Sequence, residues 1–438
     1  MFTIVIAPLP VPGHVNPSLR LARSLQRAGH RVVYLGIPEI EDEVRAEGFD
    51  FRAVFGDVLP KGRVAELRGA ASRLKGLSLL GFLRTQVLAL NQVLRRLEAG
   101  ELDGVLREVG AELLVCDEKL RHLAVLGHGL KLPVLQMNVT VPPEFIPLPA
   151  GAKRGPGRGA AIPFEGLLVA LGLLPRLRAS LEVLAKKHGY PLRRERGQLA
   201  LERALSPELL LCPREFVEAR VKGAPGEYCF TEPCIDLERQ EADFPWEQLE
   251  DGRPLVSFAL GTLAGNSPHH RRLLQAAFDA AALRPDWRFV IAVGSTFDPA
   301  SFPARDNVVA VRIAPQLGLL RRAAVMVNHA GTNSVKECIA FGVPMVAIPL
   351  QFDQPDIGRL VEMHGVGRVL APREVTAERL VAALDDVLGT QSYRDACMKL
   401  REHFRRAEAG PGAAGAIEDF LARRASRLPG DAHVHATG

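Results

Sequence analysis

The sequence predicts an α/β protein with two Rossmann-like domains whose parallel sheets face a central cleft. Three observations lead to this fold class. The chain has 438 residues, 47% of them hydrophobic, which is too long for one ordinary core and rich enough in apolar side chains to fill two. Short β-rich apolar runs alternate with helical patterns along the chain. A stretch rich in proline, glycine and acids, residues 222–254, separates these runs into two series.

The apolar runs are expected to form strands, and the patterns between them helices that cover both faces of each sheet. In the first series the expected strands are residues 2–7, 31–36, 113–117, 133–137 and 209–212. In the second series they are residues 255–260, 288–293, 308–313, 325–329, 345–349 and 367–370.

The chain is therefore expected to divide into five parts. They are an N-terminal domain (1–225), a linker (226–253), a C-terminal domain (254–408), a helix packing back toward the N-terminal domain (409–426) and a disordered tail (427–438).

Composition excludes several classes of protein. The net charge of +5 comes without a basic run interleaved with aromatics, so nucleic acid is not an expected partner. Six scattered cysteines suit free thiols in a reducing cytoplasm, and Cys229 and Cys234 lack a second pair at zinc spacing. The N-terminus is typical of a strand rather than a signal peptide, and the longest apolar stretch, 162–175, is too short to span a bilayer. A cytoplasmic protein is expected.

Residues 329–342 have the features of a phosphate site. A strand ending at His329 leads through small residues into a helix that Gly342 ends. The backbone amides of Thr332, Asn333 and Ser334 would lie unpaired at the positive end of this helix, beside His329 and the Ser334 hydroxyl. In open α/β sheets, ligands bind at such strand ends.

Further acids and amides follow in an informative order. Glu337 shares a helix face with Asn333 and is placed to accept hydrogen bonds from a ribose diol. Asp353 and Gln354 emerge together after the next strand and suit the hydroxyls of a hexose. Phosphate, ribose and sugar binders in this order indicate a nucleotide sugar. The alternative is that Asn333 and Ser334 cap the helix and that the acids only complement its dipole or form turns.

A second candidate site follows the first strand. Gly13 and His14 are expected in a loop, with Asn16 capping the next helix and Pro17 in its first turn. A neutral His14 there could take a proton from an attacking hydroxyl; the alternative is a loop histidine bonded to backbone. The loop lacks GxGxxG, which disfavours a nicotinamide oxidoreductase.

Asp117 ends the strand 113–117 and should project at the same sheet edge as His14. A carboxylate there could orient the imidazole. The alternatives are that Glu118 takes this part or that Asp117 is a solvated strand-end acid. His122 and His128 lie in the following helical stretch and are interpreted as structural.

Residues 312–359 closely resemble the donor-binding signature of the UDP-glycosyltransferases, inverting enzymes with the two-Rossmann GT-B fold, and "PGHVNP" resembles the loop that bears their base. The chain is most similar to the bacterial branch that acts on lipophilic natural products, including carotenoid (zeaxanthin) glucosyltransferases and macrolide glycosyltransferases. The resemblance implies catalysis by His14 with Asp117, and transfer of a hexose, expected to be glucose, from a UDP-sugar. It also implies a set of donor-binding residues: Gly261, Thr262, Ile313, Ala314, Gln316, His329, Gly331, Thr332, Asn333, Ser334, Glu337, Asp353 and Gln354.

Within that set, His329 and Ser334 would bind the diphosphate, with Gly261 and Thr262 approaching it from the other side. Glu337 would bind the ribose. Gln316 would lie near the nucleoside, and the backbone of Ala314 would contact the base. Asp353 and Gln354 would hold the transferred sugar. Two positions depart from the family pattern, because Ile313 and Thr332 stand where many relatives carry tryptophan.

No metal and no cofactor are expected. The chain has no DxD motif, and the helix amides with His329 could stabilise the leaving diphosphate. One-step displacement would convert an α-linked UDP-sugar into a β-glycoside.

The acceptor is expected to be a lipophilic molecule with a hydroxyl, such as a carotenoid, polyketide or macrolide. The apolar helical stretches 74–97 and 164–189 either pack the core or wall a groove for it. The Gly- and Arg-rich stretch 151–160 is expected to form a surface loop that could touch anionic lipid, and the protein to be a monomer or dimer. Alternatives are a catalytically silent nucleotide-sugar-binding protein and a UDP-sugar epimerase on the same fold.

Overall fold

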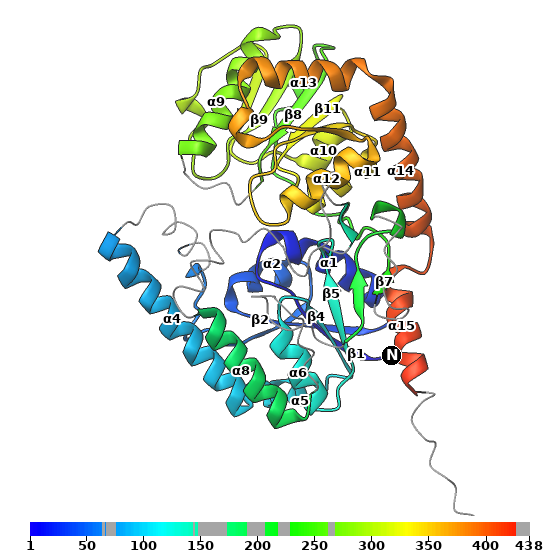
Figure 1. Ribbon diagram of the computed structural model, residues 1–438. Helices are drawn as coiled ribbons and strands as arrows, with labels where there is room; N and C mark the ends of the chain where they lie inside the picture. The colour runs from blue at the N-terminus through cyan, green and yellow to red at the C-terminus, as the bar shows by residue number, and fades with distance from the viewer. Residues whose placement is uncertain are drawn as a thin grey trace, which may run out of the picture.

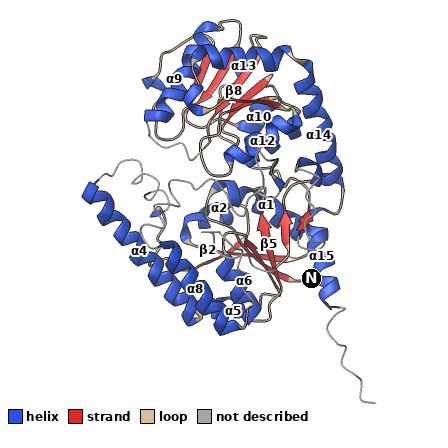
Figure 2. Ribbon diagram, in the orientation of Figure 1, coloured by secondary structure: helices blue, strands red, loops and turns tan. Residues whose placement is uncertain are grey.

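Two parallel sheets with helices on both faces organise the chain (Figures 1 and 2). The computed structural model describes residues 1–63, 66, 76–142, 145–147, 173–190, 206–217, 228–261 and 268–425. The stretch 151–160, the expected tail and residues 164–172 of the second apolar stretch lie outside this part of the chain.

The N-terminal sheet has seven strands in the order β3-β2-β1-β4-β5-β6-β7, and all neighbours pair in parallel. The strands are β1 (Thr3–Ala7), β2 (Arg31–Gly36), β3 (Asp50–Ala53), β4 (Leu113–Asp117), β5 (Val134–Asn138), β6 (Glu208–Leu210) and β7 (Tyr228–Phe230). Central strands such as β1 and β4 are buried on both faces, which is why they appear in the sequence as continuous apolar runs.

Two edge strands were not predicted. In β3 only Phe51 is buried, so no apolar run marks it. β7 has three residues and lies inside the stretch 226–253 expected to be the linker, so the connection between the sheets begins after Phe230.

The helices of this half cover the sheet in two layers. They are α1 (Pro12–Arg27), α2 (Glu41–Ala46), α4 (Gly76–Ala99), α5 (Glu101–Val109), α6 (Arg121–Gly129) and α8 (Leu173–His188). Ile4 and Ile6 of β1 face a cluster that includes α1 residues, whereas Val5 and Ala7 face the cluster under α4, α5, α6 and α8. This alternation is the period of two expected for a strand.

The C-terminal sheet has six parallel strands in the order β10-β9-β8-β11-β12-β13. They are β8 (Leu255–Ala259), β9 (Arg288–Ala292), β10 (Val308–Val311), β11 (Val325–Asn328), β12 (Met345–Ala347) and β13 (Gly367–Val369). The helices are α9 (Pro268–Leu283), α10 (Gln316–Leu320), α11 (Thr332–Phe341), α12 (Gln354–His364), α13 (Ala377–Gly389), α14 (Gln391–Ala409) and α15 (Gly412–Ala425). Short 3₁₀ turns lie at Pro38–Ile40, Arg214–Phe216, Trp246–Leu249, Pro299–Ser301 and Pro372–Glu374.

The two halves share packing. One hydrophobic cluster contains Phe216 of the first half together with Phe404 of α14, whose rings meet edge to face at 5.9 Å. After α14 the chain returns to the first half, where Ala413 and Ile417 of α15 join the cluster beneath α1 (Figure 1). These contacts hold the two sheets in one arrangement around the space between them.

The strand order places a switch point in each sheet. The chain leaves β1 toward β2 on one side, and β4 pairs on the other; β8 lies in the same way between β9 and β11. Loops diverge at such points, so ligands bind there in open α/β sheets. None of the helices that the structure describes is both long and apolar enough to cross a membrane.

Candidate active site

His14 and Asp117 meet at the switch point of the N-terminal sheet. The His14 Nδ1 atom lies 2.6 Å from Asp117 Oδ2, and the two side chains are 15% and 1% exposed. Asp117 ends β4, whereas His14 lies in the first turn of α1, which begins at Pro12 after Val11. The expectation that Gly13 and His14 form a loop capped by Asn16 is therefore wrong: proline at the first helical position starts the helix earlier.

Asp117 is held from several directions. Its Oδ1 accepts from the Lys119 backbone N–H at 3.0 Å, and its Oδ2 accepts from the Leu9 N–H at 3.5 Å besides His14. The residue is fully buried, which rules out a solvated strand-end acid. Glu118 is not the partner of His14, because its carboxylate pairs with Lys119 Nζ. Since a carboxylate only accepts, Nδ1 of His14 carries the hydrogen in this contact, so in the neutral ring the lone pair is on Nε2.

A proline in α1 frees a backbone carbonyl of the His14 turn to bond the other half of the chain. Pro17 lies inside α1, and without an N–H it cannot bond the Gly13 carbonyl four residues before it. That carbonyl instead accepts from Asn333 Nδ2 at 2.9 Å, across the space between the sheets. The residue before His14 is thus tied to the helix start expected to bind phosphate.

The turn between β11 and α11 has its own supports. Ala330 adopts a left-handed φ of +57°, and its N–H donates to the side-chain Oδ1 of Asn328 at 2.8 Å. Gly331 is the N-cap of α11, and none of the side chains that the structure describes caps the helix start. The alternative that Asn333 and Ser334 serve as caps is therefore wrong, and the amides at the start of α11 remain available to a ligand.

His329 lies between two glycines. A Cβ at Gly261 would lie 2.5 Å from the ring Cε1, and one at Gly331 would lie 2.5 Å from Nε2, so both positions must be glycine for the ring to fit. Burial, with a smaller contribution from His270, lowers the pKa of His329 to about 4. The ring is therefore neutral at pH 7, and its buried Nδ1 has no partner among the described residues. Positive potential at this place comes from the helix start.

The expected sugar binders are oriented by α11 and by backbone. Thr332 Oγ1 donates to Asp353 Oδ2 at 2.9 Å. The side-chain Oε1 of Gln354 accepts from the backbone N–H groups of Leu350 and Gln351, each at 2.8 Å. These bonds leave the amide NH₂ of Gln354 as the group that can reach a ligand, so it would act as a donor.

Both carboxylate oxygens of Glu337 accept hydrogen bonds from other side chains. Its Oε1 accepts from Arg239 Nη1 at 2.5 Å and its Oε2 from Arg239 Nη2 at 3.3 Å and Gln316 Nε2 at 2.5 Å. Gln316 also donates to Ser334 Oγ at 3.2 Å, which joins the residues expected near the nucleoside and the phosphate.

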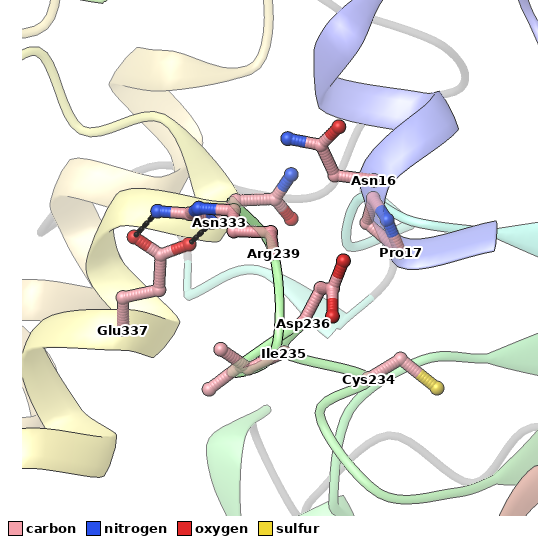
Figure 3. A pocket seen from close by; sticks show the side chains of 8 residues that line it. All are labelled: Asn16, Pro17, Cys234, Ile235, Asp236, Arg239, Asn333 and Glu337. Carbon is pink, nitrogen blue, oxygen red and sulfur yellow. Dashed lines mark hydrogen bonds and ion pairs between the residues drawn. The ribbon is translucent and has the colours of Figure 1, made fainter. Parts of the chain in front are cut away.

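Arg239 was missed by sequence reasoning. It comes from the connecting segment among acids, where no pattern marks it. It lines a small pocket between the two halves (Figure 3), formed by Asn16, Pro17, Cys234, Ile235, Asp236, Arg239, Asn333 and Glu337.

Two of the remaining expected contacts follow strand β10. Ile313 is 60% exposed just after β10, and Ala314 is partly buried against the core. Thr262 lies outside the described residues. In the part of the chain that the structure covers, no group of three or more His, Cys, Asp or Glu side chains could hold a metal ion.

Comparisons with known proteins agree with this architecture. The family model described as UDP-glucoronosyl and UDP-glucosyl transferase matches residues 244–407. The demethyllactenocin mycarosyltransferase of Streptomyces fradiae is 28% identical over 422 residues, covering 94% of this chain and 85% of that protein. The zeaxanthin glucosyltransferase of Pantoea ananas is 23% identical, with 98% of each protein covered. The crystal structure of the glycotransferase of kitacinnamycin matches with a TM-score of 0.67 at 21% identity, covering 97% of this chain and 98% of that one. The GT-B fold is confirmed.

Proposed function

We propose a specific reaction for this chain on the premise that it belongs to the family of UDP-glucosyl and UDP-glucuronosyl transferases and is a glycosyltransferase. The reaction is inverting, metal-independent transfer of a hexose from a UDP-sugar to a hydroxyl of a lipophilic acceptor. His14 is the general base, and Asp117 orients it.

The hydrogen bond of 2.6 Å between His14 Nδ1 and Asp117 Oδ2 carries this proposal. It leaves Nε2 of a partly exposed ring free to take the acceptor proton as the acceptor oxygen attacks the anomeric carbon. The buried carboxylate then stabilises the imidazolium that forms. A histidine with only a structural purpose would not need a buried acid on one nitrogen and an open face on the other.

The donor side supports a departing diphosphate. The amides at the start of α11 are uncapped, and His329 adds a neutral ring hydrogen-bond donor beside them. Both hydrogen-bond the oxygens that gain charge as the bond to the sugar breaks, which is the leaving-group stabilisation that a metal provides in other transferases. The proton goes to His14 and the bonding pair leaves with UDP, so attack from the opposite face yields a β-glycoside from an α-linked donor.

The sugar and acceptor classes are inferred from side-chain chemistry and from the names of relatives. Glucose suits Asp353 as acceptor and Gln354 as donor of hydrogen bonds, and a relative is named zeaxanthin glucosyltransferase. Relatives named for demethyllactenocin, oleandomycin and zeaxanthin support a large, lipophilic natural product with a free hydroxyl.

His14→Ala tests the mechanism. With UDP-glucose and a panel of hydroxylated lipophilic acceptors, the variant is expected to lose about 10³-fold in kcat while its Kd for UDP stays unchanged, because only the proton transfer is removed. UDP release and product mass are the measurements. His128→Ala, which removes an exposed histidine of the same domain, is the matched control and should stay active.

Two results would count against the proposal. An active His14→Ala variant would show that the base is elsewhere. Conversion of the UDP-sugar without any acceptor would indicate an epimerase instead.

A further inference from the structure

The carboxylate expected to bind ribose is held by an arginine from outside its own sheet. Arg239 lies on the irregular segment between β7 and the Trp246–Leu249 turn, and its guanidinium contacts both oxygens of Glu337. The side chains of the pair are 20% and 4% exposed. Figure 3 shows the Arg239 side chain reaching Glu337 within the pocket that Asn333 also lines.

This contact conflicts with ribose binding. A ribose diol would donate two hydrogen bonds to Glu337, yet the two-point contact with Arg239 and the bond from Gln316 already use three of the roughly four lone-pair sites of the carboxylate. A nucleotide that binds here must therefore move the guanidinium. The Gln316 amide can stay, because a carboxylate has enough lone pairs for the diol and one further donor.

We propose that Arg239 is a nucleotide-binding residue that exchanges Glu337 for the diphosphate when the nucleoside diphosphate enters. This inference rests on the proposed function, in which Glu337 binds ribose and the start of α11 binds the diphosphate. The exchange replaces an internal ion pair by two ligand contacts: Glu337 binds the ribose, and Arg239 binds the phosphates.

The guanidinium has to move only a short distance in this exchange. Asn333 lies at the second position of α11, so the helix start is about one turn, roughly 5.4 Å, from Glu337. Arg239 and Asn333 line the same pocket, so the guanidinium stays within it when it moves toward the phosphates. Its fork of donors suits two phosphate oxygens as well as a carboxylate.

Glu241 and Asp236 also attract the Arg239 guanidinium, but among the described residues neither accepts a hydrogen bond from it. Glu241 lies 3.7 Å from Arg239 Nη2, beyond hydrogen-bond distance, and its carboxylate already accepts from the N–H groups of Leu317 and Gly318 at 2.7 and 2.8 Å. Departure of Arg239 thus leaves Glu241 bonded. A diphosphate carries more negative charge than the single carboxylate that Arg239 gives up, so the exchange is favourable only for a phosphorylated ligand.

Binding of uridine and of UDP to Arg239→Met separates this exchange from other roles. Uridine must break the ion pair without offering phosphates, so its affinity should rise about fivefold in the variant, where Glu337 is free. UDP loses a charged partner, so its affinity should fall about tenfold. Titration calorimetry of the full-length protein with each ligand measures both.

Two further variants sharpen the test. Arg239→Lys keeps the charge but not the fork, so uridine should bind more tightly and UDP nearly as well as to the unchanged protein. Arg373→Ala removes an 87% exposed arginine of the same half and controls for net charge; it should alter neither affinity.

Opposite shifts for the two ligands support the exchange. Shifts in the same direction, or unchanged UDP affinity in both Arg239 variants, would overturn it. If the unchanged protein binds neither UDP nor uridine, the proposed function itself fails, which is a separate result.

Discussion

The Thr332 side chain orients the carboxylate of Asp353. Its hydroxyl lies 2.9 Å from Asp353 Oδ2 and donates a hydrogen bond to it. The hydroxyl fixes one oxygen of the carboxylate and leaves the other for the sugar. Thr332 is thus a positioning residue for the expected sugar contact, and its bond ties the loop before α12 to the start of α11.

Removing this hydroxyl should weaken donor use. Thr332→Val has nearly the same shape but leaves Asp353 without its partner, so we expect kcat/KM for UDP-glucose to fall about tenfold, in line with the loss of one hydrogen bond to a charged group. Initial rates of UDP release measure it. Thr332→Ser keeps the hydroxyl and should recover most of the loss; equal losses in both variants would contradict a role for the hydrogen bond.

Phe352 is a second residue whose surroundings only the fold reveals. It has a φ of +56°, is 46% exposed and directly precedes Asp353. Left-handed backbone is unfavourable for a bulky side chain, and such strain is concentrated at functional sites. The strained turn presents Asp353 and Gln354 at the start of α12.

Helix α1 lacks one of its internal backbone hydrogen bonds because Pro17 lies within it. Pro17 removes one internal hydrogen bond of the helix, and the freed Gly13 carbonyl accepts from Asn333 of the other half. The carbonyl freed by Pro17 therefore links α1 to α11 at the residue before His14. Helices α1 and α11 are coupled through it, since one carries the expected base and the other the expected phosphate site.

A double-mutant cycle on Pro17 and Asn333 measures this coupling. Asn333→Ala alone leaves the Gly13 carbonyl without a protein partner and should lower kcat severalfold. In a Pro17→Ala background the restored N–H bonds that carbonyl, so the same change should cost less. We expect a coupling energy of about 1 kcal/mol, the usual net value of one hydrogen bond. Steady-state kcat and the UDP Kd of the four proteins provide the data, and strictly additive effects would rule out the coupling.

At the scale of the whole molecule, three buried histidines make the free energy of unfolding depend on pH below neutrality. Burial lowers the pKa of His122, His270 and His329 to about 4 in each case, and these residues lie in both halves. An unfolded histidine has a pKa of about 6.5, so acid protonates the unfolded chain first. Their contribution to stability is complete above pH 6.5 and is lost as the pH falls toward 4.

His122→Leu tests this pH dependence. His122 is 9% exposed, and its Nε2 has no partner among the described residues. An apolar side chain loses the hydrogen bond between His122 and the Leu177 backbone, but it loses it at every pH, so the difference between two pH values still reports on protonation. The unchanged protein should lose about 2 kcal/mol from this one group between pH 7 and pH 5, and the variant should not. Urea denaturation at both pH values gives the two differences in unfolding free energy; equal differences would contradict the assignment.

The sequence alone was sufficient for the features that depend on local pattern. Continuous apolar runs identified the inner strands of both sheets, because these strands are buried on both faces. The strand ends also predicted that Asp117 would lie at the same sheet edge as His14, where the two side chains pair. Short or half-exposed edge strands such as β3 and β7 carry no such pattern and were missed.

Only the tertiary structure decided how these residues act on one another. Arg239 meets Glu337 across 98 positions of sequence, and Asn333 meets the Gly13 carbonyl across 320. Contacts of this kind arise from the packing of one half of the chain against the other, and burial, not residue type, makes His329 neutral. A strand end can be predicted from a few neighbouring side chains, whereas the partner that occupies it depends on how the two sheets come together.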